Sequence, residues 1–277
     1  MKDYLFPLSI VFYASPLPLL ILSGLLLLGL YFRRKTYRIA LLIVVCLLSL
    51  HWLGNYYLSS KPLANKGNSK ILFWNLAKRE QLSISSITNQ VNVYQPEILA
   101  FVEAPHTTLK NLDALKTALS NYNFITLKGA MLVAAKGDIT LLDFNLKEDA
   151  YKVNLLDIST KTSHIKLMIT DLTANVFVNK KAPLEFVVNY AQNNDVDLIV
   201  GDFNAPYEST FFKPYESNFT SFHHFSNGFT ATWPLGIPLL ELDHIWLSKR
   251  HEPIKLTKHY HNASDHAMLI SDFRLRN

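Results

Sequence analysis

The sequence predicts an α/β domain in which two sheets pack face to face, preceded by a pair of membrane-spanning helices. Three observations lead to this fold class. Strand-like apolar runs alternate with helix-like segments on both sides of the region 124–170, and that region itself consists of consecutive strand-like runs. The first 60 residues hold two long runs without a charged residue. We therefore divide the chain into a hairpin at 1–60, a polar linker at 61–69 and a domain at 70–277.

The uncharged runs, Tyr4–Phe32 and Ile39–Ser60, both exceed the about 20 apolar residues that cross a bilayer core. Prolines in the first run shorten its span to about residues 17–32, and the second span covers about residues 39–58. The connection between the runs carries four positive charges, those of Arg33, Arg34, Lys35 and Arg38. Such a cluster marks a cytoplasmic loop, so we expect an integral protein of a bacterial plasma membrane whose domain lies outside the cytoplasm. A cleaved signal peptide is the alternative, but the second apolar run would still have to span the bilayer.

The domain itself is almost neutral. The whole chain has 27 Lys and Arg and 22 Asp and Glu, of which five basic residues and one acidic residue lie in 1–60, leaving 22 basic and 21 acidic groups. Nucleic-acid binding normally needs a strongly basic surface, so nucleic acid is a partner that this charge does not favour. The single cysteine, Cys46, lies in the second apolar run, which excludes an intrachain disulfide and a cysteine metal site.

The domain begins with a strand-like run at 71–76, a helical pattern at Ser83–Tyr94 and a second strand within 97–105. After the middle strands, a helical stripe at 184–191 precedes a short, β-branched, buried strand at 196–200. Strand–helix units on both sides of a β meander suit two sheets that pack face to face.

Polar side chains lie at the C-terminal end or the edge of these predicted strands. They are Asn75, Glu103, Asp171, Asp202, Asn204, Asp243, Asp265 and His266. Oxygen ligands without cysteine suit a hard cation such as Mg²⁺ or Mn²⁺. A carboxylate beside an amide can orient and deprotonate water, and a carboxylate–histidine pair can hold a proton donor against a phosphoryl oxygen. The set predicts metal-assisted phosphoester hydrolysis.

Plainer interpretations exist for parts of this set. The segment Gly201–Asn204 also forms ordinary Asx-turns, Asn75 could simply cap a strand, and Asp243 could pair with a surface lysine. His259 and His261 would point the same way on a strand, but no third zinc ligand is evident.

The order of these motifs resembles the endonuclease/exonuclease/phosphatase, or DNase I-like, superfamily. The matching pieces are Trp74-Asn75, Glu103, Gly201-Asp202-Phe203-Asn204, Asp243-His244 and Ser264-Asp265-His266. Thr232-Trp233-Pro234 and the hairpin resemble its membrane-anchored bacterial branch, the VanJ-like and YafD-like proteins. The resemblance covers about Lys70 to Leu275, and it implies a four-layered α/β sandwich and a divalent metal, Mg²⁺ or Mn²⁺.

The resemblance also implies a role for each residue near the metal. Glu103 would bind the metal, Asn75 would lie beside it, and Asp265 would be an acid on the metal side or just behind it.

For the catalytic residues, the resemblance implies that Asp202 aligns or deprotonates the attacking water, while Asn204 orients the water or the phosphate. His266 would contact the phosphoryl oxygen and would be held by Asp243.

The chain departs from the family pattern at Thr170-Asp171-Leu172, where the resemblance implies a histidine facing the phosphate. An ionised carboxylate at Asp171 repels phosphate, although it could bind metal instead. The acid often found two residues after the first asparagine is also replaced, by Ala77. Three hypotheses remain open: a membrane-tethered phosphoesterase for a phospholipid or lipid-linked phosphate, a nuclease of the same fold, and a catalytically degenerate binding module.

Overall fold

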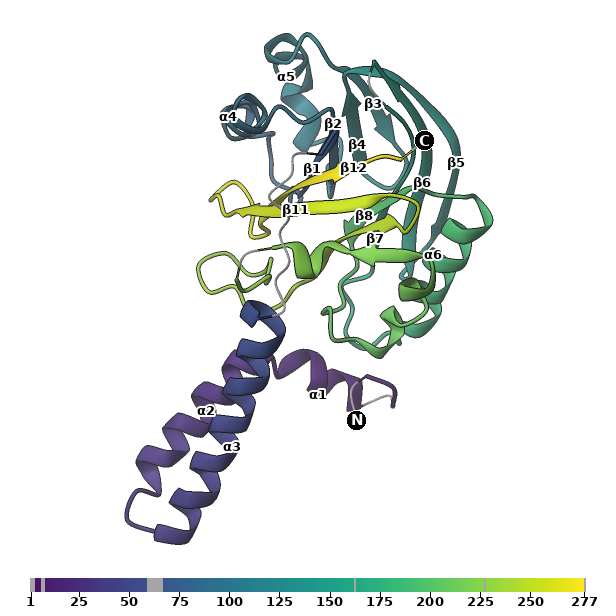
Figure 1. Ribbon diagram of the computed structural model, residues 1–277. Coiled ribbons are helices and arrows are strands. Elements are labelled where there is room, and N and C mark those ends of the chain that lie inside the picture. Colours follow the sequence, from purple (N-terminus) through teal and green to yellow (C-terminus); the bar gives the residue numbers. More distant parts are fainter. Residues whose placement is uncertain (1–2, 6–7, 59–66, 162, 227, 277) are drawn as a thin grey trace.

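The computed structural model describes the whole chain except residues 1–2, 6–7, 59–66, 162, 227 and 277. Figure 1 shows a layered domain with two long helices projecting from one end and a short helix beside their junction with the domain. Most of the predicted linker at 61–69 lies outside the described residues, which resume at Gly67.

The strands form two mixed sheets of six. The first has the order β11-β12-β1-β2-β4-β3 and the second β5-β6-β7-β8-β10-β9. The first sheet consists of β1 (Ser69–Asn75), β2 (Ile98–Val102), β3 (Asn123–Leu127), β4 (Met131–Ala135), β11 (Glu252–His259) and β12 (Met268–Arg274). The second consists of β5 (Gly137–Lys147), β6 (Tyr151–Thr160), β7 (His164–Leu172), β8 (Leu198–Asp202), β9 (Phe219–Ser221) and β10 (Asp243–Ser248).

The predicted α/β sandwich is confirmed, with four layers. Helices α4 (Ile84–Tyr94) and α5 (Leu112–Ala118) cover the outer face of the first sheet, and α6 (Lys181–Asn193) covers that of the second. Strand alternation explains the layering, because successive side chains point to opposite faces. In β1, Phe73 packs between the sheets, whereas Trp74 packs beneath α4 and α5.

The N-terminal region contains α1 (Leu8–Ala14), α2 (Leu17–Leu30) and α3 (Lys35–Leu53), the last continued by a π-helical turn at Gly54–Leu58. Helices α2 and α3 lie side by side as a hairpin (Figure 1). They approach closely at Gly24, where a Cβ would stand 2.6 Å from a Val45 methyl.

Among the residues that the structure describes, one helix, Lys35–Leu58, is long and apolar enough to cross a membrane. Helices α1 and α2 would form a second span only if the two together crossed the membrane as one bent helix. They meet at an angle of 79°. The boundaries of 17–32 and 39–58 and the orientation in the membrane stay predictions.

Candidate active site

Strand direction brings the polar side chains to one edge of the two sheets. β1 and β2 are parallel, as are β7 and β8, so both pairs end at this edge. β12 and β10 run antiparallel to β1 and β8, so their N-terminal ends lie there instead. Asp243 is the first residue of β10, and His266 comes two residues before β12. These two side chains therefore reach the edge from the starts of strands.

Four charged residues form a row across the second sheet at this edge. Lys152 on β6 lies opposite Asp171 on β7. Asp171 in turn lies opposite Asp202 on β8, and Asp202 opposite Asp243 on β10. Residues opposite each other in register point to the same face of a sheet. The row therefore places one ammonium and three carboxylate groups side by side.

The backbone around Asp202 explains its neighbours in sequence. A Cβ on Gly201 would stand 2.2 Å from the Thr170 carbonyl oxygen, so only glycine lets β8 lie this close to β7. Asn204 has a φ of 47°, in the left-handed region that asparagine tolerates better than most residues. Its backbone N–H donates to Asp202 Oδ1 at 2.8 Å, and its side chain donates to the Leu172 carbonyl at 2.8 Å. The Asx-turn is therefore present, and it fixes one oxygen of the carboxylate.

Asp202, Asp243 and His266 form a buried cluster. One ligand atom from each lies within 4.8 Å of the others, and the described residues show no other such group of three or more. His266 Nδ1 is 2.8 Å from Asp243 Oδ2, and His266 Nε2 is 3.9 Å from Asp202 Oδ2. Asp243 therefore orients the ring so that Nε2 faces Asp202 and the space beside it.

Asn75 connects the first sheet to this cluster. Its side-chain amide donates to Asp202 Oδ2 at 2.8 Å, and its amide oxygen accepts from the Ala77 N–H at 2.8 Å. The Ser264 hydroxyl donates to the Asn75 carbonyl oxygen at 2.7 Å. Asn75 was predicted to lie beside the metal. In this structure its amide nitrogen and its amide oxygen are both hydrogen-bonded to other protein groups.

Glu103 and Asp265 complete the set around the cavity described below. Glu103 follows β2 with a φ of 52°, an uncommon backbone conformation that clusters at functional sites. Its carboxylate is 3.3 Å from the Lys78 ammonium. Asp265 Oδ2 accepts a hydrogen bond of 3.0 Å from the indole N–H of Trp233. All eight predicted site residues therefore lie at this edge of the sandwich.

The cluster holds closely coupled charges. Burial alone would lower the pKa of His266, but the charge and hydrogen bond of Asp243, with Asp202 adding, raise it to about 10. The imidazole is therefore a cation at neutral pH. Burial and then the charge of Asp243 raise the pKa of Asp202 well above its usual range.

A divalent cation fits this surplus of acid. Asp243 Oδ1 and Asp265 Oδ1 are buried and have no hydrogen-bond partner among the described residues. Unpaired buried carboxylate oxygens are costly, and an added cation would both pair them and lower the pKa of Asp202. The donors are carboxylate oxygens, which suit Mg²⁺ or Mn²⁺.

Comparison with known proteins agrees with this arrangement. The sequence matches the model of the endonuclease/exonuclease/phosphatase family over residues 72–266. The chain belongs to this family. Its members are phosphoesterases or nucleases, which supports a hydrolase acting on phosphoester bonds. No curated protein matches the sequence.

Solved structures of the endonuclease/exonuclease/phosphatase fold are similar at low identity. A family protein from Bacteroides vulgatus has a TM-score of 0.58 at 14% identity, covering 75% of this chain and 99% of that one. A mannosyl-6-phosphatase from Bacteroides thetaiotaomicron gives 0.54 at 13% identity, covering 74% and 99%. D. rerio TDP2 complexed with a single-strand DNA product gives 0.56 at 12% identity, covering 74% and 98%. These likenesses concern the fold, and the VanJ-like and YafD-like branch stays a prediction.

The family departure at Asp171 has a local structural answer. Asp171 is buried, and its Oδ2 lies 2.5 Å from the ammonium of Lys152, the residue opposite it in the row. Burial raises the pKa of Asp171, and Lys152 opposes that rise. A second lysine, Lys180, is 1% exposed, and its ammonium donates to the Thr173 carbonyl. Burial lowers the pKa of Lys180 to about 8, although Asp202 and Asp171 both act to raise it.

Sequence analysis missed both lysines. Lys152 pairs with Asp171 through the register of β6 against β7, which the residues alone do not reveal. Lys180 directly precedes α6, and the packing of that helix buries it.

The cavity at this candidate site, which we call the catalytic cavity, has a volume of about 550 Å³. Its polar wall consists of Lys78, Glu103, Asp202, Asn204, Asp265 and His266. Its apolar wall includes Trp233 and Leu242 from the domain, and Ile10, Tyr13 and Ala14 from α1. The N-terminal segment therefore helps to enclose the site.

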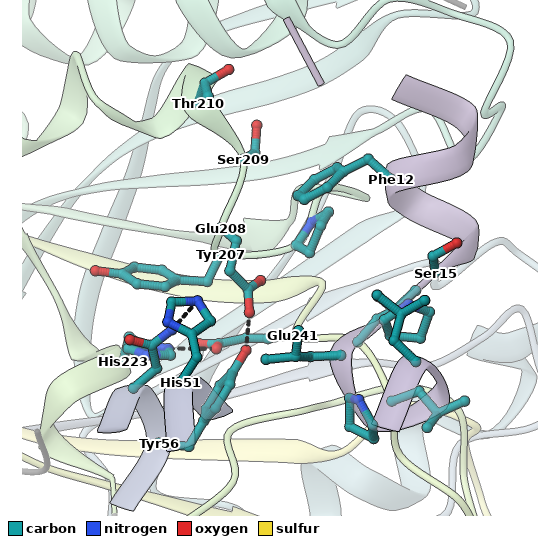
Figure 2. Close-up of a pocket in the computed structure, with 18 of the residues that line it drawn as sticks. Phe12, Ser15, His51, Tyr56, Tyr207, Glu208, Ser209, Thr210, His223 and Glu241 are labelled. Carbon is teal, nitrogen blue, oxygen red and sulfur yellow. Dashed lines mark hydrogen bonds and ion pairs between the residues drawn. The ribbon is translucent and has the colours of Figure 1, made fainter. Parts of the chain in front are cut away.

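A second cavity, of about 670 Å³, lies between the hairpin and the domain (Figure 2). There the Tyr56 hydroxyl of the hairpin donates to Glu208, and His223 Nδ1 is 2.6 Å from Glu241 Oε2. Glu208 lies only four residues after Asn204, so the hairpin is hydrogen-bonded to the segment that carries Asp202. No predicted site residue lines this cavity.

Proposed function

We propose that the chain is a membrane-anchored, divalent-metal-dependent hydrolase in which water attacks a phosphate mono- or diester of a phospholipid or lipid-linked phosphate. The observation that carries this proposal is the buried cluster of Asp202, Asp243 and His266, joined to Asn75 from the other sheet. Carboxylate, amide and imidazolium groups that converge at one end of a sandwich provide the parts of phosphoester hydrolysis.

In this mechanism the protonated His266, held by Asp243, donates a hydrogen bond from Nε2 to a phosphoryl oxygen and stabilises the charge that develops there. Asp202, oriented by Asn75, accepts the proton of the attacking water. A Mg²⁺ or Mn²⁺ ion held by Glu103 and Asp265 would supply positive charge beside the phosphate.

Two features support a lipid substrate in place of nucleic acid. The hairpin would hold the cavity at a membrane surface, and part of the cavity wall is apolar. The almost neutral charge of residues 61–277 does not favour a nuclease, although TDP2, which has a similar fold, was solved in complex with a single-strand DNA product. The four positive charges between α2 and α3 favour a domain outside the cytoplasm.

The test is hydrolysis of p-nitrophenyl phosphate and bis(p-nitrophenyl) phosphate by the full chain in detergent, with Mg²⁺ and with a chelator. We expect Asp202→Ala to lower kcat/KM about 10²- to 10⁴-fold, because the proton acceptor is lost. Asp113→Ala is the matched control, since Asp113 is fully exposed on α5. Activity that survives both Asp202→Ala and chelation contradicts the proposal.

Asp171 favours a second candidate, a binding module that keeps the fold without catalysis, because a buried carboxylate stands where the family pattern has a histidine. Titration calorimetry with Mg²⁺ and Mn²⁺ separates the two, since a degenerate site binds neither ion. Activity that appears only in Asp171→His would favour the binding module.

A further inference from the structure

Three segments that line the catalytic cavity also carry exposed apolar side chains close in sequence to their lining residues. We call Leu8 and Val11 on α1, Phe177 before α6, and Ile237 before β10 the cavity rim. We propose that the cavity rim is a bilayer-contact surface, so that the catalytic cavity opens onto the membrane that holds the hairpin. This inference rests on the proposed function, and it adds a contact that the hairpin itself does not make.

Helix α1 is apolar on both of its faces. Ile10, Tyr13 and Ala14 line the catalytic cavity, whereas Leu8 is 45% and Val11 61% exposed. A helix that is apolar all round is normally buried on all sides, in a core or in a membrane. The domain covers the inner face only, so the outer face needs an apolar partner.

The N-terminal segment is fastened to the domain, which prevents α1 from turning its outer face inward. The carboxylate of Asp3 is 1% exposed and accepts hydrogen bonds from the Thr210 N–H at 2.9 Å and the Thr210 hydroxyl at 2.7 Å. The hydroxyls of Ser209 and Tyr13 donate to the same carboxylate. Four donors to one buried carboxylate hold the start of the chain against the segment that follows Asn204.

The bend before α2 sets the direction of α1 relative to a membrane. Only Ser15 and Pro16 separate α1 from α2, and the two helices meet at 79°. If α2 and α3 cross the bilayer, α1 therefore lies almost parallel to its surface, as interfacial helices do. Figure 1 shows α1 leaving the top of the hairpin and extending beneath the domain.

The other two rim residues lie on loops whose neighbours line the same cavity. Val176 lines the cavity, and Phe177 next to it is 69% exposed. Trp233 and Leu240 line it from the two ends of one loop, and Ile237 between them is 71% exposed. Large apolar residues exposed together around a binding site mark an interaction surface.

The occupant that fits is the lipid of the hairpin's own bilayer. Only two residues separate α1 from α2, which enters the membrane. A partner protein would therefore have to fit into the narrow space between the domain and the membrane. Only α1 lies between the lipid and the catalytic cavity. Because a helix is about 10 to 12 Å in diameter, the cavity is about that far from the lipid. A phosphate in a lipid headgroup lies within that reach, and an apolar chain attached to it can remain in the bilayer.

The test measures the depth of the rim in phosphatidylcholine nanodiscs that hold the full chain. In a Cys46→Ser background, single cysteines replace Phe177, Ile237 or Val93, and each carries a nitroxide spin label. Val93 is 70% exposed, like the two rim residues, and α4, which carries it, lies on the side of the domain away from the hairpin (Figure 1). We expect labels at 177 and 237 to collide more with oxygen than with a water-soluble nickel complex, and the label at 93 to show the reverse. Labels at 177 and 237 that behave like the label at 93 overturn the proposal.

Activity separates this inference from the proposed function. We expect the double variant Phe177→Ser, Ile237→Ser to hydrolyse p-nitrophenyl phosphate as the parent does, but to lose about tenfold in activity on phosphatidic acid in vesicles. An equal loss on both esters, or none on the lipid, contradicts a bilayer-contact surface. Failure of the parent to hydrolyse either ester contradicts the proposed function instead, while the spin labels still report the position of the rim.

Discussion

The two halves of the charged row differ in how their carboxylates are neutralised. Asp202 and Asp243 share His266, whose ring nitrogens face the two carboxylates at 3.9 and 2.8 Å. Asp171 instead pairs with Lys152 at 2.5 Å. The first half matches the pattern that the sequence resemblance implies, and in the second a carboxylate and a lysine from the neighbouring strand stand where that pattern has a histidine.

A charge that a substitution introduces into a sequence motif can therefore be neutralised by a residue on the neighbouring strand. The residue opposite in register is the nearest source of a counter-charge, and Lys152 occupies that position. Lys152 therefore places a positive charge beside Asp171, in another cavity that shares Lys78 and Glu103 with the catalytic one. Substituting residues of each half in turn measures how much that half contributes to hydrolysis and to stability.

The largest loss of activity is expected from Asp243→Asn, in the first half. Removing this carboxylate charge lowers the pKa of His266, which Asp243 and Asp202 raise to about 10. In the parent the imidazolium persists until pH approaches 10, whereas in the variant it is lost at lower pH. We expect kcat/KM at pH 8 to fall about 10³-fold, and the alkaline limb of the pH–rate profile to move to lower pH. Asp113→Asn should leave kcat/KM and the alkaline limb unchanged. If the alkaline limb does not move in Asp243→Asn, Asp243 and His266 do not act as a unit.

A smaller change, in stability, is expected from Lys180, whose charge interacts with Asp202 in one half and with Asp171 in the other. Its pKa falls from 10.5 to about 8 on folding, so below pH 8 it is protonated in both states, while between pH 8 and 10.5 only the unfolded chain holds the proton. Unfolding free energy therefore rises with pH in that window, by up to about 3 kcal/mol.

Comparing the parent with Lys180→Met isolates this contribution. We expect denaturant titrations in detergent at pH 7 and pH 10.5 to show the parent gaining stability relative to the variant as pH rises. Lys255→Met, at an exposed position on β11, serves as the control. A difference that does not depend on pH would mean that Lys180 keeps an ordinary pKa.

The sandwich was predictable because strand alternation and helix spacing are local properties of the sequence. The apolar run before Gly201 became β8, and Asp202 ends it. The predicted site residues could be located for the same reason, since a polar residue at either end of an apolar strand is visible in sequence, as Asp202 is after β8 and Asp243 is at the start of β10. The division of roles among Glu103, Asn75 and Asp265 stays a prediction.

Features that depend on register and on long-range packing could not be predicted. The opposition of Lys152 and Asp171 is set by the pairing of β6 with β7, and a shift of one residue would turn Lys152 to the other face. The contribution of α1 to the cavity depends on Asp3 meeting Thr210, which is 207 residues away in sequence. Neither contact leaves a pattern that composition or periodicity can detect.

The smallest effect, and the one that bears most directly on the comparison, is expected in the second half. Lys152→Met leaves the buried Asp171 carboxylate without its partner and removes a positive charge from the cavity that shares Lys78 and Glu103 with the catalytic one. We expect kcat/KM for a phosphodiester to fall about tenfold, because Lys152 is partly exposed and water screens its charge. Asp171→Asn should restore most of this activity in the Lys152→Met background, since it removes the charge that the lysine neutralises.

The double-mutant cycle decides between compensation and coincidence. If Lys152 stands in for the missing histidine, the effects of Lys152→Met and Asp171→Asn are strongly non-additive, as expected for residues in direct contact. If the pair contributes nothing to hydrolysis, both single variants remain within about twofold of the parent, as Lys255→Met should. In that case the second half of the row contributes nothing to hydrolysis, and the cluster of Asp202, Asp243 and His266 acts alone.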